Sequence, residues 1–178
     1  MIDYGKFQFA CAPRVGVSWF VKACQLAGLG PAFVRTHRPT PHNGKHRVSL
    51  VRHPVGWLES IYAARRVGWG SDFLGKLSHL DTLQQPLEGF IWQYLESMPG
   101  EVGKLMLAYE ADVILRIEDV PEAFLSLVSP MGIGEEFFRG IRNLGRTHVN
   151  PLHPQVGMAQ RKRIMESEKE LCDGFNYF

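Results

Sequence analysis

Residues 6–19 read KFQFACAPRVGVSW, and this stretch decides the fold that we predict for the chain. Its first half, residues 6–12, has the apolar and aromatic content of a short buried strand. Residues 18–28 (SWFVKACQLAG) have the pattern of a helix that begins at Ser18 as its N-cap and ends at a glycine. Three polar residues share one narrow face of that helix, so we expect the rest of it to be buried against a sheet.

The alternation of strands and helices continues along the chain. Further strands are expected at residues 33–37, 46–51 and 113–117. Further helices are expected at residues 54–66, 83–98, 101–109, 121–128, 135–144 and 159–172. This order predicts an α/β fold with a three-layer, open, mostly parallel sheet and helices on both faces. We expect a single domain over residues 1–178.

The composition is that of an ordinary globular protein, with 45% hydrophobic and 21% charged residues. Residues 1–66 hold ten Lys and Arg against two acidic residues, a net charge of +8, whereas the remainder holds ten against sixteen, a net −6. This asymmetry suggests an anionic ligand for the first third of the chain, although a basic solvated face explains it equally well. Nucleic acid is not expected, because there is neither a Lys/Arg tract nor a stacking-aromatic motif.

The cysteines and the apolar segments indicate the compartment. Cys11, Cys24 and Cys172 are too scattered for a disulfide framework or a zinc site, so we expect free thiols. Residues 1–13 do not resemble a signal peptide, since no basic segment precedes an apolar one. No apolar run approaches the ~20 residues that span a bilayer. We therefore expect a soluble, cytoplasmic protein without a membrane partner, and no feature indicates its oligomeric state.

Residues 13–19 (PRVGVSW) form the predicted turn between the first strand and the first helix. Such a turn presents unpaired backbone N–H groups and the positive end of a helix dipole to an anion. Gly16 permits close approach of the backbone, Ser18 adds a hydroxyl donor, and Arg14 brings a fixed positive charge. The spacing of a Walker A loop is absent. A glycine at such a turn also has a plain structural explanation, so the turn alone does not identify a ligand.

This turn resembles the 5′-phosphosulfate loop of the sulfotransferase family, usually written P-K-S-G-T-T-W. The matching positions are Pro13, Gly16, Ser18 and Trp19. The departures are Arg14, in place of lysine, and Val15 and Val17, in place of hydroxyl residues. The resemblance implies that residues 14–18 hold the phosphosulfate of 3′-phosphoadenosine-5′-phosphosulfate (PAPS) and that Arg14 stabilises charge on the leaving oxygen. It also implies that Trp19 stacks on adenine, with a core tryptophan as the alternative.

A second motif, residues 51–54 (VRHP) followed by Ser60, resembles the family's 3′-phosphate site. That site has R-x-P with a serine eight residues after the arginine. Arg52 ends a predicted strand, and Ser60 lies in the second turn of the next helix, away from its apolar stripe. A capping arginine and a solvated serine are the alternative. With both motifs in order along the chain, the resemblance implies that Arg52 and Ser60 bind the 3′-phosphate.

A third motif, residues 35–39 (RTHRP), resembles the family's K-T-H-x-P segment, in which the histidine is the catalytic base. Histidine suits this role because its pKa lies near neutrality. We expect His37, at the end of the second strand, to neighbour Arg14 in a parallel sheet, with an exposed loop histidine as the alternative. Residues 116–119 (RIED) resemble a segment that is mainly structural in the family, and Glu118 is expected to act in that way. Residues 139–150 match the family's basic C-terminal loop only loosely, so we expect a plain surface loop there.

The resemblance implies a PAPS-dependent sulfotransferase with a P-loop NTPase-like fold. Such an enzyme passes a sulfonate from PAPS to a hydroxyl or amine by direct in-line displacement and releases 3′-phosphoadenosine-5′-phosphate (PAP), without a metal. The acceptor can be a small molecule, a glycan or a peptide, and residues 67–80 and 145–154 are expected to line its site. Because Val15 and Val17 remove hydroxyl donors, the alternative is a weak or inactive protein that binds PAP or PAPS. A P-loop kinase is a third possibility, against which the missing Walker lysine argues.

Overall fold

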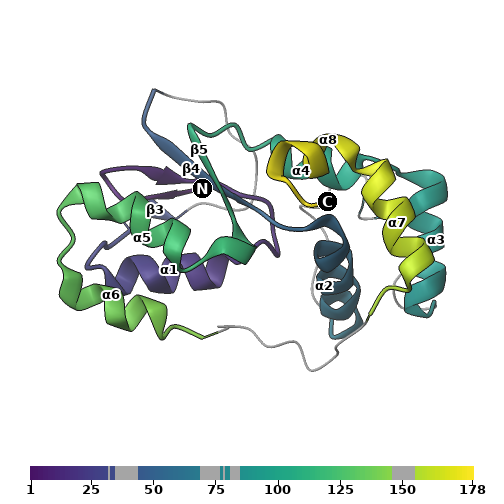
Figure 1. Cartoon of the computed structure of the whole chain (residues 1–178), viewed down its shortest axis with the longest axis horizontal. Helices are drawn as coiled ribbons and strands as arrows, with labels where there is room; N and C mark the ends of the chain where they lie inside the picture. Colours follow the sequence, from purple (N-terminus) through teal and green to yellow (C-terminus); the bar gives the residue numbers. More distant parts are fainter. Residues whose placement is uncertain (32, 35–43, 69–76, 78, 81–84, 146–154) are drawn as a thin grey trace. The chain divides into compact units, whose positions relative to one another are not determined.

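The computed structural model describes residues 1–31, 33–34, 44–68, 77, 79–80, 85–145 and 155–178 (Figure 1). The chain divides into two compact units, and each unit is built from two separate segments. Unit 1 comprises Met1–Val51 and Tyr109–Val149, and unit 2 comprises Arg52–Ala108 and Asn150–Phe178. The strands lie in unit 1, whereas the described regular structure of unit 2 is helical.

Unit 1 contains a mixed sheet with the strand order β3-β1-β2-β4-β5. The strands are β1 (Ile2–Asp3), β2 (Gln8–Phe9), β3 (Phe33–Val34), β4 (Arg47–Val51) and β5 (Val113–Arg116). Strands β2, β4 and β5 are parallel to one another, whereas β1 is antiparallel to both of its neighbours. The predicted α/β class is confirmed, and the sheet is mixed because β1 reverses direction.

Strand β1 is an element that the sequence pattern did not indicate. It lies between β2 and β3, so the strand that precedes His37 pairs with β1 and not with the strand that precedes Arg14. This corrects the expectation that those two strands are neighbours. The physical reason is a tight turn at Gly5, whose φ of +77° lets the first residues fold back along β2.

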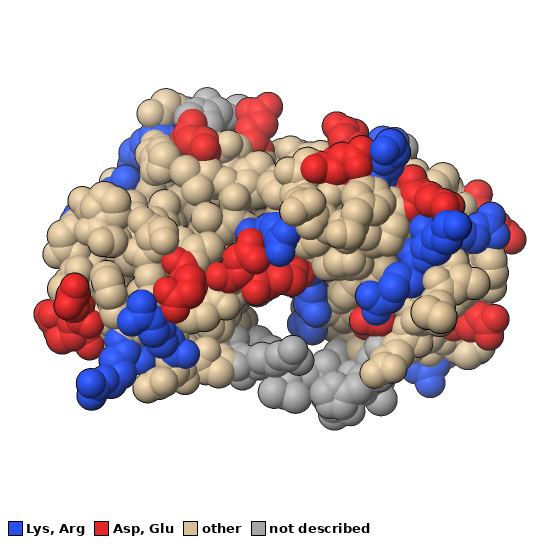
Figure 2. Space-filling model, viewed as in Figure 1, with Lys and Arg blue, Asp and Glu red and all other residues tan. Residues whose placement is uncertain are grey.

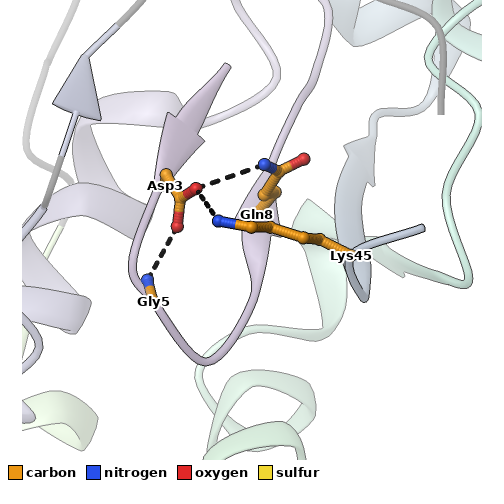
Figure 3. Close-up of polar contacts among 4 residues, drawn as sticks. All are labelled: Asp3, Gly5, Gln8 and Lys45. Atoms are coloured by element: carbon orange, nitrogen blue, oxygen red, sulfur yellow. Dashed lines mark hydrogen bonds and ion pairs between the residues drawn. The ribbon is translucent and has the colours of Figure 1, made fainter. Parts of the chain in front are cut away.

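A carboxylate holds this hairpin in place. The Asp3 carboxylate accepts hydrogen bonds from Lys45 Nζ at 2.7 Å, from the backbone N–H of Gly5 at 2.8 Å and from Gln8 Nε2 at 3.2 Å (Figure 3). These donors, Lys45 first, lower the pKa of Asp3 to about 2. The ionised carboxylate therefore joins β1, the turn, β2 and the approach to β4.

Helices α1 (Val17–Leu26), α5 (Glu122–Val128) and α6 (Glu135–Arg142) pack together in unit 1 (Figure 1). The ring of Phe9 on β2 stacks on Phe20 of α1, with centroids 3.8 Å apart and planes 7° apart. Phe20 in turn meets Phe124 of α5 edge-on at 5.2 Å. All three rings are buried, and edge-on and stacked pairs of this kind add roughly 0.5–1.5 kcal/mol each beyond their buried area. They fix α1 and α5 on the Phe9 side of the sheet.

The predicted faces of α1 are confirmed. Its exposed residues include Ser18, Lys22 and Gln25, and its buried residues are Trp19, Phe20, Ala23 and Cys24. Two short 3₁₀ helices complete unit 1, namely η2 (Ile117–Asp119) after β5 and η3 (Ser129–Met131) after α5.

Unit 2 contains α2 (Pro54–Arg66), α3 (Leu87–Ser97), α4 (Glu101–Leu107), α7 (Met158–Ser167) and α8 (Lys169–Phe175). Helices α2, α3 and α7 pack against one another, and α8 packs against α4 and α7. The core of the first three helices is fully buried and includes Trp57, Leu58, Ile61, Phe90, Tyr94 and Ile164. The carboxylate of Glu59 on α2 accepts a hydrogen bond from the N–H of Val156 at 2.9 Å, which fixes the entry to α7.

The cysteines are free thiols, and all three are buried. Burial raises the pKa of Cys24 to about 12, so this thiol stays protonated and unreactive. Over the described residues, none of the helices has the length and apolar character needed to cross a membrane.

Candidate functional site

The turn between β2 and α1 contains two residues with left-handed backbone conformation. Arg14 has a φ of +64°, and Gly16, the N-cap of α1, has a φ of +100°. Gly16 also lacks room for a side chain, because an added methyl group would overlap the side chain of Ile117 in η2. Both the positive φ and the close approach of Ile117 therefore favour glycine at this position.

Helix α1 begins without a cap from any side chain in the described part of the chain. The first N–H groups of an α-helix have no acceptor within the helix, and they lie at the positive end of its dipole. Ser18, the predicted N-cap, is instead the second helical residue, because Gly16, with its left-handed backbone conformation, is the N-cap and α1 begins at Val17. The backbone N–H groups of residues 17–19 thus form an arrangement that suits an anion.

Arg14 and Val15 occupy very different surroundings within this turn. Arg14 is half-buried, and burial lowers the pKa of its guanidinium, which nevertheless stays charged at neutral pH. Val15 has no exposed surface and belongs to the core of unit 1. Val15 stands where the sulfotransferase motif has a hydroxyl residue, and it contributes to the packing of the core of unit 1.

Trp19 is packed into unit 1. It is 7% exposed, and its indole Nε1 donates a hydrogen bond to the carbonyl of Leu144 at 3.1 Å. Its ring meets Phe124 edge-on, with centroids 5.7 Å apart. This packing favours the alternative of a core tryptophan, because stacking on adenine would require the ring to leave these contacts.

In unit 2, Arg52 and Ser60 belong to one face of α2. A methyl group added at Gly56 would lie 3.5 Å from Arg52 Nε, so the guanidinium rests on the first turn of the helix. Ser60 lies one helical turn beyond Gly56, on the same face. Arg52, Gly56 and Ser60 are half-buried, whereas their helix neighbours Trp57, Leu58 and Ile61 are buried. The side chain of Arg52, which precedes α2, and Ser60 therefore lie toward the same face of α2, and their joint binding of a phosphate stays a prediction.

Helix α2 begins with a side-chain cap. His53 is its N-cap, and His53 Nδ1 accepts a hydrogen bond from the N–H of Val55 at 3.2 Å. Pro54, at the first helical position, has no N–H to offer. The ring of His53 also contacts the ring of Tyr177, with centroids 5.1 Å apart. The start of α2 thus has fewer backbone donors for an anion than the start of α1.

Several predicted residues lie outside the described part of the structure. His37 and the rest of residues 35–39 are among them, as are residues 146–150 and most of the two loops expected to line an acceptor site. Their roles stay predictions. In the described part of residues 139–150, Arg139 and Arg142 lie on α6, and Arg142 Nε pairs with the carboxylate of Glu122 at 3.0 Å.

Sequence reasoning missed the contribution of the segment that follows β5. Ile117 lies against Gly16, and Arg116 forms a bidentate pair with Asp119, with Nε at 2.9 Å and a terminal guanidinium nitrogen at 3.0 Å. The structural role expected for Glu118 stays a prediction, and the pair described for Arg116 is with Asp119. The available signal was the position of this segment after an apolar strand, because the carboxyl ends of parallel strands meet at one edge of the sheet.

On the face drawn in Figure 2, Lys and Arg side chains lie beside Asp and Glu side chains in both units. Over the described residues, His, Cys, Asp and Glu form no group of three or more that could hold a metal ion. Comparison of the chain with family models, with curated proteins and with solved structures gave no match. The function is therefore inferred from the two described motifs and their geometry.

Proposed function

We propose that the protein is a PAPS-dependent sulfotransferase with a P-loop NTPase-like, three-layer arrangement. The observation that carries the proposal is the start of α1, where uncapped backbone N–H groups follow a half-buried Arg14 and a Gly16 at which a side chain would be strained. Backbone donors and a fixed positive charge on one turn suit the 5′-phosphosulfate, because they are preorganised for an anion.

In the proposed reaction the acceptor oxygen or nitrogen attacks the sulfur in line with the leaving oxygen. A bond from the acceptor to sulfur forms, the S–O bond to the nucleotide breaks, and the acceptor proton passes to a base. Arg14 and the N–H groups of residues 15–18 hold the phosphosulfate and neutralise charge on the oxygen that leaves with PAP. His37 is the proposed base, and no step is assigned to a metal.

Arg52 and Ser60 are the proposed 3′-phosphate ligands, and they distinguish PAPS from ATP. Support comes from their shared face on α2 and from the way that helix begins. Because the N–H of Val55 is bonded to His53 and Pro54 has none, an anion at this place depends on side chains. Arginine is well suited, since its planar guanidinium can bind a phosphate with two hydrogen bonds.

A second candidate is a protein that binds PAP or PAPS without transferring the sulfonate. The specific observation is the burial of Val15, because this position of the turn packs in the core and has no side-chain hydroxyl to donate to the phosphosulfate. With valine at position 17 as well, Ser18 is the hydroxyl residue left in residues 14–18. Fewer donors reduce the stabilisation of charge that develops during transfer, even where the nucleotide still binds.

Calorimetric titration with PAP, and with ATP as the reference nucleotide, tests the nucleotide site. We expect the wild-type protein to prefer PAP and Arg52→Ala to lose about 10–100-fold in affinity for PAP, since a charged hydrogen bond contributes roughly 1.5–3 kcal/mol. Arg161→Ala, which removes an exposed arginine from α7 of the same unit, is the matched control and should bind PAP like wild type. Equal affinity for PAP and ATP, or an unchanged Arg52→Ala, would contradict the proposal.

Transfer of labelled sulfonate from PAPS to a panel of phenols, sugars, amines and peptides separates the two candidates. Labelled product from any acceptor class supports the enzyme. Saturable PAP binding without product across the panel would support the binding protein instead.

A further inference from the structure

Glu168 is a buried carboxylic acid at the junction of α7 and α8 in unit 2. Its exposed surface is 2%, and its Oε2 accepts a hydrogen bond from the N–H of Gly103 on α4 at 2.7 Å. The N–H groups of Gly100 and Val102 also stabilise this carboxyl. Its other oxygen, Oε1, is buried without a hydrogen-bond partner in the described structure. Burial with an unpartnered oxygen is unfavourable, and more so for the ionised form.

The carboxyl group of Glu168 occupies the space beside Gly103 that a side chain at that position of α4 would fill. A methyl group added at Gly103 would lie 2.9 Å from Glu168 Oε2 and 3.3 Å from Leu171 Cβ on α8. A small cavity of about 80 Å³ adjoins the group and is also lined by Lys104, Ser167 and Glu170. A cavity of this size admits water, so a proton can reach the carboxyl without unfolding of the unit.

The charged groups around Glu168 come from three helices. On α4, Lys104 pairs with Glu101 at 2.8 Å, and on α7, Lys162 pairs with Glu166 at 4.0 Å. On α8, Lys169 pairs with Asp173 at 2.9 Å, and the remaining titratable groups are Glu170 and Cys172. Within the described structure, no cation is paired with Glu168 to offset its burial.

We propose that Glu168 is a pH-sensitive clasp that holds the α7–α8 junction on the first turn of α4 when protonated and loosens this contact when ionised. Burial raises the pKa of Glu168 to about 7, and the backbone N–H groups oppose this shift without cancelling it. The clasp is independent of the proposed sulfonate transfer, because α4, α7 and α8 contain none of the residues proposed for that reaction.

The sign of the pH dependence follows from proton linkage. In the unfolded chain the pKa of this carboxyl is the ordinary 4.5, so between that value and about 7 the folded state binds more protons. The stability of the clasp is therefore full below the unfolded pKa and is lost as the pH rises through the folded pKa.

Amide hydrogen exchange of Gly103 in the full chain tests the clasp, after correction for the intrinsic pH dependence of exchange. We expect the opening equilibrium of the wild type to rise by up to about 100-fold between pH 5 and pH 8. Glu168→Gln keeps the shape without the ionisation, so its opening equilibrium should stay flat over this range. Glu170→Gln, which removes an exposed carboxyl beside the same cavity, should behave like wild type.

A second measurement avoids dependence on how well the variant folds. The carboxyl ¹³C shift of Glu168 in the wild-type protein should titrate with a midpoint near pH 7. A midpoint near the ordinary value of 4.5 would overturn the proposal, as would equal pH dependence of Gly103 exchange in wild type and Glu168→Gln.

Discussion

The strand-to-helix junctions before α1 and α2 each carry an arginine, and they begin their helices in opposite ways. In unit 1, β2 leads into α1 through two left-handed residues, Arg14 and Gly16, and no side chain of the described residues caps the helix. At the second junction, β4 leads into α2, the first helix of unit 2, through Arg52, and the side chain of His53 caps that helix ahead of Pro54.

The difference concerns which atoms are available to an anion. At α1 the donors are backbone N–H groups, so the conformation of the turn decides what can bind. At α2 the N–H of Val55 is already bonded, so binding depends on the side chains of Arg52 and Ser60. Substitutions that disturb the backbone should therefore matter most at the first junction, and substitutions that truncate side chains should matter most at the second.

The largest contrast is expected between two glycine-to-alanine variants. Gly16→Ala should lower the free energy of unfolding by about 2–5 kcal/mol, because it adds left-handed strain and overlap with Ile117. Gly56→Ala should leave stability unchanged or raise it by up to ~1 kcal/mol, because alanine favours a helix interior. Its methyl group would meet Arg52 Nε at an ordinary contact distance of 3.5 Å. Urea unfolding of both variants measures the contrast.

A double variant identifies the cause of the loss at Gly16. Ile117→Ala removes the overlapping side chain but leaves the left-handed backbone as it was. Gly16→Ala combined with Ile117→Ala should therefore be more stable than the sum of the two single effects. Additive losses would mean that Ile117 does not restrict the turn, and equal stabilities of Gly16→Ala and Gly56→Ala would remove the contrast between the junctions.

Arg14→Gly separates the charge of the first junction from its conformation. Glycine adopts a φ of +64° without strain, and this relief should offset lost contacts, so the free energy of unfolding should change by less than about 1 kcal/mol. PAP affinity should fall about 10–100-fold, because a charged hydrogen bond is lost. Calorimetry and urea unfolding measure the two quantities, with Lys22→Ala on the exposed face of α1 as the control. Wild-type affinity in Arg14→Gly would exclude this arginine from the site.

The parts of the fold that local signals specify were predicted from the sequence. An apolar run ending in R-x-P predicted the junction of β4 and α2, and the proline is at the first helical position as expected. Strand β1 has two residues and therefore no periodicity to detect. Its place depends on the bond between Asp3 and Lys45, which are 42 residues apart, and such pairings are not visible in a local pattern.

The candidate site, like the fold, depends partly on neighbouring residues and partly on residues that are distant in the sequence. Residue types at the turns indicated Arg14, Gly16 and Arg52, whereas the close approach of Ile117, which follows β5, to Gly16 is not visible in a local pattern. Glu168 lies in the predicted helix at residues 159–172, among charged residues that suggest a solvated face. The structure instead divides that helix into α7 and α8 and buries Glu168 at the junction. Nothing in the surrounding residues distinguishes it, because its burial depends on the glycine of α4 that it contacts.

The smallest contrast is expected between two serine-to-alanine variants. Ser60→Ala removes a side-chain donor from the second junction, so PAP affinity should fall about 3–10-fold while ATP affinity stays unchanged, as expected for a neutral hydrogen bond. Ser18→Ala should reduce PAP affinity by less, because the backbone N–H groups at the start of α1 are still present. Titration of both variants with both nucleotides measures the difference. If Ser18→Ala has the larger effect, the first junction binds through its side chains as well, and the distinction between a backbone site and a side-chain site fails.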